Sequence, residues 1–215
     1  MTPADDPRLA SKTILYLHGY GSTGQAYKAM LLREMFPQCR VVSPTMDYDH
    51  TAPQHLYDSI RETAEQAHVD LMVGSSFGGY QALCATTWFA GPVWLVNPVT
   101  RLLPVLQLLW PQATSSLHPA PSAAATGSPS TATDEAERRL TAYVDFDREV
   151  FARLPRRENQ LHFALSTDDE TLGNHAHVPA MFPHAAQIVW MADCGHRCLR
   201  FAELRADMAS SLLRT

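Results

Sequence analysis

The chain alternates between short runs that are apolar at nearly every position and longer segments whose apolar residues recur every three or four positions. An unbroken apolar run is typical of a strand buried on both faces of a parallel sheet, and the wider spacing is typical of an amphipathic helix. The runs predict strands at residues 13–17, 40–44, 69–73, 92–96, 160–165 and 187–191. The helical spacing predicts helices at residues 25–36, 52–67, 80–88, 134–154 and 175–182, and a last helix that buries Phe201, Leu204, Met208 and Leu212.

Strands and helices follow one another in a regular order, which favours right-handed β–α–β units. The predicted fold class is therefore α/β, with about six mainly parallel strands and helices on both faces. We expect one domain over residues 1–215, since domains commonly hold about 100–200 residues. In the second helix, Thr51 is a candidate cap. The expected apolar faces are Tyr27, Met30, Leu31 and Met35 in the first helix, and Leu56, Ile60 and Ala64 in the second.

The regular order breaks between the fourth and fifth predicted strands. Residues 101–110 are apolar, residues 111–133 are dominated by Pro, Ala, Ser and Thr, and helical spacing returns at residue 134. A stretch with so little to bury is typical of a loop or flap. Residues of about 100–156 are therefore predicted to be an insertion that forms a cap and a flexible loop.

The segment Gly74-Ser75-Ser76-Phe77-Gly78 joins the third apolar run to a helical segment and matches the G-x-S-x-G pattern of a nucleophile elbow. Glycines two positions before and after a serine allow the strand and the helix to approach where a Cβ would collide. Such a turn would project the Ser76 hydroxyl beyond the sheet and aim the N–H of Phe77 at a developing oxyanion. Ser75 lacks glycines at both offsets, so we expect it to be structural.

Two more polar turns follow predicted strands, in the chain order that a nucleophile, an acid and a histidine have in the α/β-hydrolase fold. Asp168 and Asp169 follow the fifth run, and His196 follows the sixth. Because the carboxyl ends of parallel strands meet at one edge of a sheet, we expect these side chains to lie near Ser76. His196 would act as the base and Asp169 would orient its imidazole, with Asp168 or Asp193 as alternative acids.

The turn His18-Gly19-Tyr20-Gly21 follows the first predicted strand, where that fold carries its other oxyanion donor. The N–H of Tyr20 is the candidate donor, beside that of Phe77. His18 is expected to brace this loop rather than to act as a base. Trp94, Trp190 and the methionines are interpreted as core packing.

A metal site is the competing interpretation of Cys194-Gly195-His196-Arg197-Cys198, with His175, His177 and His184 nearby in the sequence. Structural zinc sites usually have paired Cys-x-x-Cys or His-x-x-x-His ligands, and neither spacing occurs here. We therefore expect inert thiols, no metal and no cofactor.

The composition says more about the possible binding partners of the protein than about its fold. The chain has 22 acidic and 17 basic residues and a net charge of −5, which argues against a nucleic-acid or anionic-membrane partner. Four cysteines in 215 residues do not make a disulfide framework. The polar, acidic start of the chain does not match a secretory signal, and no apolar run approaches the roughly 18–20 residues of a membrane span. We expect a cytoplasmic protein that acts on a small molecule.

With these residues in view, the chain resembles the YqiA/YcfP-like family of small bacterial esterases with the α/β-hydrolase fold. The matching segments are Leu15-Tyr16-Leu17-His18-Gly19-Tyr20, Val73-Gly74-Ser75-Ser76-Phe77-Gly78-Gly79-Tyr80, Val96-Asn97-Pro98 and Gly195-His196. The resemblance implies Ser76 as nucleophile, Asp169 as acid and His196 as base, in an esterase that favours short acyl chains, with thioester cleavage also possible. Asp168 stands where the family tends to have glycine, and the insertion at 111–133 is atypical of it.

The function predicted is hydrolysis of a small carboxylic ester or thioester through an acyl-Ser76 intermediate. Residues 102–110 and the helix near 143–151 are expected to cap an apolar pocket for the acyl group. Two alternatives stay open: acyl transfer by the same three side chains to an acceptor other than water, and a non-catalytic binding module on the same fold.

Overall fold

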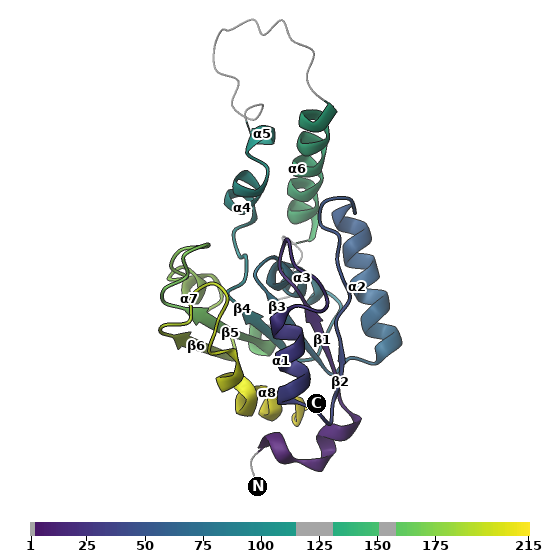
Figure 1. Cartoon of the computed structure of the whole chain (residues 1–215), viewed down its shortest axis with the longest axis vertical. Helices are drawn as coiled ribbons and strands as arrows, with labels where there is room; N and C mark the ends of the chain where they lie inside the picture. Colours follow the sequence, from purple (N-terminus) through teal and green to yellow (C-terminus); the bar gives the residue numbers. More distant parts are fainter. Residues whose placement is uncertain (1–2, 115–130, 151–157) are drawn as a thin grey trace, which may run out of the picture.

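One parallel sheet organises the molecule. The computed structural model describes residues 3–114, 131–150 and 158–215, and these contain a six-stranded sheet in the order β2-β1-β3-β4-β5-β6 (Figure 1). Every neighbouring pair of strands in it is parallel. The strands are β1 (Thr13–Leu17), β2 (Arg40–Val42), β3 (Leu71–Ser75), β4 (Val93–Val96), β5 (Leu161–Ser166) and β6 (Gln187–Met191). The predicted α/β class with six parallel strands is confirmed.

Helices cover both faces of this sheet. The α-helices are α1 (Tyr27–Met35), α2 (Pro53–Ala67), α3 (Phe77–Ala85), α4 (Leu102–Leu109), α5 (Pro111–Thr114), α6 (Thr131–Val150), α7 (Val178–Met181) and α8 (Arg205–Leu212). Short 3-10 helices lie at Pro3–Asp5, Pro7–Ser11, Glu158–Gln160 and Phe201–Leu204. Helices α4 to α6 extend beyond the main body that surrounds the sheet (Figure 1). Residues 115–130, most of the predicted flap, and Phe151 and Leu154 of the predicted helix lie outside the described residues.

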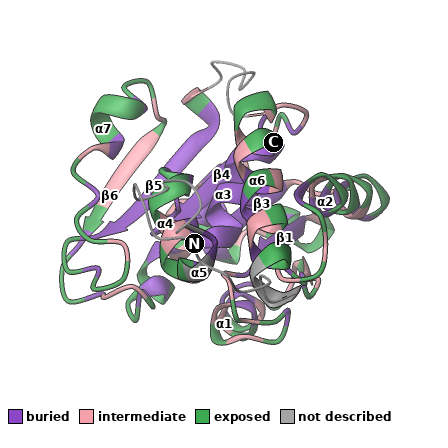
Figure 2. Ribbon diagram, turned by 90° about the horizontal axis from the view of Figure 1, so that it is seen from above, coloured by how far each residue is buried: buried purple, intermediate pink, exposed green. Residues whose placement is uncertain are grey.

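Successive side chains along the strands point to opposite faces of the sheet and pack into two separate hydrophobic cores. Leu15 and Leu17 of β1 pack on the side of α2, α3 and α6, whereas Ile14 and Tyr16 pack on the side of α1 and α8. The central strands are buried along their whole length, while edge strand β6 is only partly covered (Figure 2). An unbroken apolar run therefore does correspond to a strand covered on both faces.

Several packing predictions are wrong. Tyr27 and Met30 of α1 are 57% and 53% exposed, and the buried face of this helix is Ala29, Leu32 and Met35. Trp190 is 44% exposed because β6 lies at the edge of the sheet, although Trp94 is fully buried as predicted. Met181 in α7 is also exposed, at 36%.

The expected cap of α2 is wrong as well. The N-cap residue is Ala52, with no side-chain cap, so Thr51 lies one residue too early. The buried stripe of Leu56, Ile60 and Ala64 is confirmed. The last helical segment also buries its predicted residues, Phe201, Leu204, Met208 and Leu212.

The order of strands fixes where a site can form. The chain runs outward from β1 to β2 and then returns to place β3 on the other side of β1. Such a reversal leaves a crevice at the carboxyl ends of the two strands on either side of it, where ligands of open α/β sheets bind. The turns after β1 and β3 carry His18-Gly19-Tyr20 and Ser76.

Within the described part of the chain, no helix combines the length and hydrophobicity needed to cross a membrane.

Candidate active site

Ser76 occupies a tight turn between β3 and α3. Its backbone has φ 54° and ψ −121°, a conformation that non-glycine residues rarely adopt. The turn is held because the N–H of Ser76 donates to the Val96 carbonyl at 3.0 Å. The Ser76 carbonyl accepts from the N–H groups of Gly79 at 2.9 Å and Val99 at 3.1 Å. The surrounding backbone therefore fixes the strained residue that carries the hydroxyl.

The two glycines of the elbow are required by packing. A Cβ on Gly78 would overlap the backbone oxygens of Leu17 and His18 in and after β1. A Cβ on Gly74 would lie 2.7 Å from Cβ of Ala82 in α3. Helix α3 thus crosses β3 and β1 at a distance that only glycine permits, as the G-x-S-x-G pattern predicts.

Ser76, His196 and Asp169 form one continuous chain of hydrogen bonds. Ser76 Oγ lies 3.0 Å from His196 Nε2, and His196 Nδ1 lies 2.9 Å and 3.0 Å from the two oxygens of Asp169. The three side chains come from the turns after β3, β5 and β6. This is the geometry in which an imidazole can accept the serine proton while a carboxylate fixes its tautomer.

The Asp169 side chain is fully buried and receives two further sets of hydrogen bonds. Its Oδ1 accepts from the N–H groups of Thr171 at 2.9 Å and Leu172 at 2.8 Å, and its Oδ2 contacts His175 Nε2 at 3.0 Å. Burial alone would raise the pKa of this carboxyl, but the hydrogen bonds from His175, His196 and Leu172 outweigh it and hold the pKa well below its usual range. Asp169 is therefore a permanent anion at neutral pH.

Asp168, one of the alternative acids, and its neighbour Glu170 make different contacts. Asp168 Oδ1 accepts from the N–H groups of Cys194 and Gly195, both at 3.1 Å, and Glu170 Oε2 accepts from the His196 N–H at 2.8 Å. Asp193 lies in the same turn as His196 with φ 53°. Asp168 and Glu170 thus hold the histidine loop by its backbone, while Asp169 reaches the imidazole itself.

Sequence reasoning missed the roles of Asn97 and His175. Asn97 is fully buried after β4, and its Nδ2 donates to Ser166 Oγ at 2.8 Å and to the carbonyls of Gly195 at 3.0 Å and His196 at 3.1 Å. Its Oδ1 accepts from the Ser166 N–H at 2.7 Å. A single amide therefore joins the ends of β4 and β5 to the histidine loop. The signal in the sequence was a lone asparagine directly after a buried strand.

His18 braces the loop after β1. Its Nε2 accepts from the Met46 N–H at 2.8 Å, so Nδ1 carries the hydrogen that is directed at the Gly19 carbonyl, also at 2.8 Å. The Tyr48 hydroxyl donates to the His18 carbonyl at 2.6 Å. Burial lowers the pKa of His18. Both ring nitrogens are therefore occupied in holding backbone, as expected of a bracing residue.

The candidate oxyanion donors lie beside the serine. A Cβ on Gly19 would be only 3.1 Å from Ser76 Cβ, so the turn that leads into Tyr20 packs closely against Ser76. Phe77 is the first residue of α3, where backbone N–H groups have no partner within the helix. The Tyr20 hydroxyl points elsewhere and donates to Asp49 at 2.6 Å.

A cavity of about 570 Å³ opens on Ser76. Its walls come from the turn after β1, the first turn of α1, the elbow and the loop of His196. Of the described residues, none from α4 or α6 lines it, although Trp110 packs against Tyr20. The predicted pocket wall at 102–110 and 143–151 is therefore not found at this cavity, and the wall is also more polar than expected.

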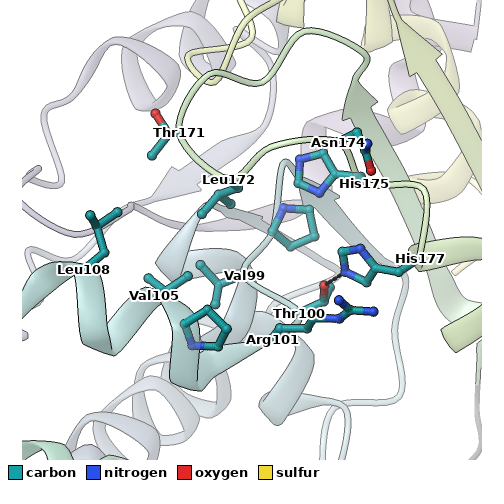
Figure 3. A pocket seen from close by; sticks show the side chains of 12 residues that line it. Val99, Thr100, Arg101, Val105, Leu108, Thr171, Leu172, Asn174, His175 and His177 are labelled. Carbon is teal, nitrogen blue, oxygen red and sulfur yellow. Dashed lines mark hydrogen bonds between the residues drawn. The ribbon is translucent and has the colours of Figure 1, made fainter. Parts of the chain in front are cut away.

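A second cavity, of about 250 Å³, is lined by α4 and by the loops after β4 and β5 (Figure 3). Val105 and Leu108 of α4 form one wall, and His175 and His177 project from the loop after β5. Thr100 Oγ1 contacts His177 Nε2 at 2.7 Å. His175 therefore lines this cavity while it binds Asp169.

The residues of the competing metal interpretation include Cys194 and Cys198. Over the described residues, no group of three or more His, Cys, Asp or Glu side chains is arranged to hold a metal ion. Cys194 and Cys198 are buried, with their sulfurs 2.8 Å apart, and burial is the main cause that raises the pKa of Cys198.

The strand order, the elbow and the three turns define the α/β-hydrolase fold. The crystal structure of an α/β-superfamily protein from Xanthomonas campestris pv. campestris has a TM-score of 0.56 at 18% identity, covering 95% of this chain and 98% of that one. A carboxylesterase structure from Nitrososphaera gargenis has a TM-score of 0.60 at 12% identity, with 97% and 93% covered. Paleococcus ferrophilus monoacylglycerol lipase has a TM-score of 0.60 at 12% identity, with 94% of each chain covered.

Within this fold, the chain belongs to the Uncharacterised protein family (UPF0227), which matches residues 13–210. This confirms the resemblance to the YqiA/YcfP-like family that the motifs indicated.

Proposed function

We propose that the protein is a serine hydrolase that cleaves a small carboxylic ester or thioester through an acyl-Ser76 intermediate. The observation that carries this proposal is the chain of hydrogen bonds from Ser76 Oγ through His196 to the buried Asp169 carboxylate. A serine hydroxyl with such partners on a strained turn has few structural uses, because the strain must be held by the surrounding backbone. The similarity in fold to a carboxylesterase and a lipase also supports an ester substrate.

The reaction would begin when Ser76 Oγ attacks the carbonyl carbon while His196 Nε2 takes the hydroxyl proton. Asp169 would stabilise the imidazolium that forms. The N–H groups of Phe77 and Tyr20 would bind the oxyanion of the tetrahedral intermediate, each contributing roughly 3–4 kcal/mol to the transition state. His196 would then give its proton to the leaving alcohol or thiol, which departs and leaves an acyl ester on Ser76.

Water would complete the cycle in the same geometry. His196 would take a proton from a water molecule as its oxygen attacks the acyl carbon, and would return the proton to Ser76 Oγ as the carboxylic acid leaves. An alcohol that entered in place of water would give acyl transfer, so the three side chains alone do not choose between hydrolysis and transfer.

The test is turnover of 4-nitrophenyl esters and of matched acyl thioesters over a range of chain lengths. We expect the wild type to hydrolyse at least one series and Ser76→Ala to lose at least about 1,000-fold in kcat. Ser210→Ala, which removes a hydroxyl on α8 that donates to the Ala206 carbonyl of the same helix, is the control and should keep wild-type rates. Activity that survives in Ser76→Ala would refute the proposal, and products formed mainly with added alcohols would favour acyl transfer.

A further inference from the structure

The cavity at Ser76 carries positive charge in a protein that is acidic as a whole. Lys28 in the first turn of α1 and Arg197, directly after His196, both line this cavity. The net charge of the whole chain is −5. Two cations beside a nucleophile are therefore a local feature that the overall composition does not explain.

Neither cation is paired with another described residue. In the described part of the chain, Lys28 and Arg197 form no ion pair and no side-chain hydrogen bond. The contrast with Lys12, the other lysine of the sequence, is direct, because Lys12 Nζ pairs with Asp70 at 3.0 Å and also contacts Thr215. Burial is the main cause that lowers the pKa of Lys28, and Arg197 lowers it further, whereas Cys198, Cys194 and Asp169 act in the opposite direction.

Three nearby carboxylates are already engaged. Asp169 is held by two histidines, and Glu170 binds the N–H of His196. Asp49, beyond Tyr20, binds that tyrosine and Arg139. The first turn of α1 contains no acidic residue. A partly buried ammonium without a direct ion pair is costly, and an anionic ligand in this cavity would supply the missing charge.

Building on the proposed hydrolase function, we propose that Lys28 and Arg197 form an anion subsite and that the substrate is an ester or thioester bearing a free carboxylate. Arg197 can bind a carboxylate through two parallel N–H groups, and Lys28 adds a compact point charge. The exposed Tyr27 and Leu199 at the rim of the same cavity would contact the carbon chain between the carboxylate and the scissile bond.

The test compares charged esters with isosteric neutral amides. In the first pair, monoethyl glutarate carries the carboxylate on its acyl side and ethyl glutaramate is the neutral amide. In the second pair, acetylglycolate carries the carboxylate on its alcohol side and acetylglycolamide is the neutral amide. For at least one pair we expect wild-type kcat/KM to favour the anion by about tenfold or more, because hydrogen bonds to charged groups are strong. Lys28→Met and Arg197→Gln should each reduce that ratio at least about threefold, mainly through KM.

Two further variants make the result specific. Lys28→Arg keeps the charge and should retain the preference for the anion. Arg33→Gln removes one positive charge from the same helix but away from the cavity, and should leave the ratio as in the wild type. Thermal unfolding of each variant shows whether it is folded.

The outcomes separate the two proposals. Hydrolysis that depends on Ser76 but shows no preference for either anion, or a preference that Lys28→Met and Arg197→Gln leave unchanged, overturns the anion subsite and leaves the hydrolase proposal standing. Absence of Ser76-dependent hydrolysis for all four esters and for the neutral 4-nitrophenyl series overturns the hydrolase proposal itself, and with it the anion subsite.

Discussion

Replacing Asp169 by asparagine tests which carboxylate serves His196. The backbone N–H groups of Thr171 and Leu172 both donate to Asp169 Oδ1, so an asparagine would keep its carbonyl oxygen at that position. Its NH2 group would then face His175 Nε2 and His196 Nδ1, where Oδ2 now lies. Because an amide N–H only donates, the 2.9 Å contact at the Oδ2 position favours an unprotonated Nδ1 with the hydrogen on Nε2. The carbonyl kept at Oδ1, 3.0 Å from Nδ1, is the one acceptor that remains for the opposite tautomer.

The wrong tautomer removes the base from the reaction. With hydrogen on Nε2, His196 cannot accept the Ser76 proton across the 3.0 Å contact. We expect kcat to fall by about 10⁴-fold, which corresponds to about 5 kcal/mol of transition-state stabilisation. In Asp168→Asn the side-chain oxygen can still accept from the N–H groups of Cys194 and Gly195, so we expect a loss of less than about tenfold.

The assay is kcat/KM for the best 4-nitrophenyl ester at pH 7.5, with urea unfolding to show that each variant is folded. A fall of several thousand-fold in Asp169→Asn alone supports the assignment. If Asp168→Asn lost that activity and Asp169→Asn stayed near the wild type, the acid would be Asp168 and the account of the tautomer would be refuted.

Three other predictions test the supports of the site. Asn97→Ala removes the amide that holds the carbonyl of His196, and should lower kcat by about 10- to 100-fold with little change in KM; an unchanged kcat would show that the loop is held without it. Gly78→Ala should lower the free energy of unfolding by about 3 kcal/mol through overlap with β1 and its turn, and a urea midpoint equal to that of the wild type would contradict the close packing. The lowered pKa of Asp169 stabilises the fold fully above its unfolded pKa of about 4 and loses that effect as pH falls toward the folded value. The stability that the wild type owes to this carboxylate, relative to Asp169→Asn, should therefore shrink as pH falls below about 4, as chemical denaturation at each pH would show.

The sequence predicted those parts of the fold that follow from local pattern. Central strands such as β1 and β3 are apolar at nearly every position because both faces are covered, and this alone set them apart. The pattern failed where burial depends on distant neighbours. Trp190 looks like a core residue in the sequence, yet it lies on the edge strand, where no further strand or helix covers it fully.

In the candidate site, too, the features set by local sequence could be predicted and those set by distant residues could not. Ser76 could be selected over Ser75 because steric demands on the flanking glycines are local. The choice between Asp168 and Asp169 could not be made from the residues alone, because it depends on which carboxylate faces a loop 27 residues further along the chain. Lys28 carried no signal, since its lack of a partner is visible only when the surrounding loops are in place.

The most direct test of the central claim is covalent labelling by a fluorophosphonate, followed by intact mass and peptide mapping. The account predicts one adduct per chain, on Ser76, that forms in the folded wild type, fails to form in Ser76→Ala, and forms far more slowly in Asp169→Asn. Absence of labelling in the wild type, or equal labelling of Ser76→Ala, would contradict it.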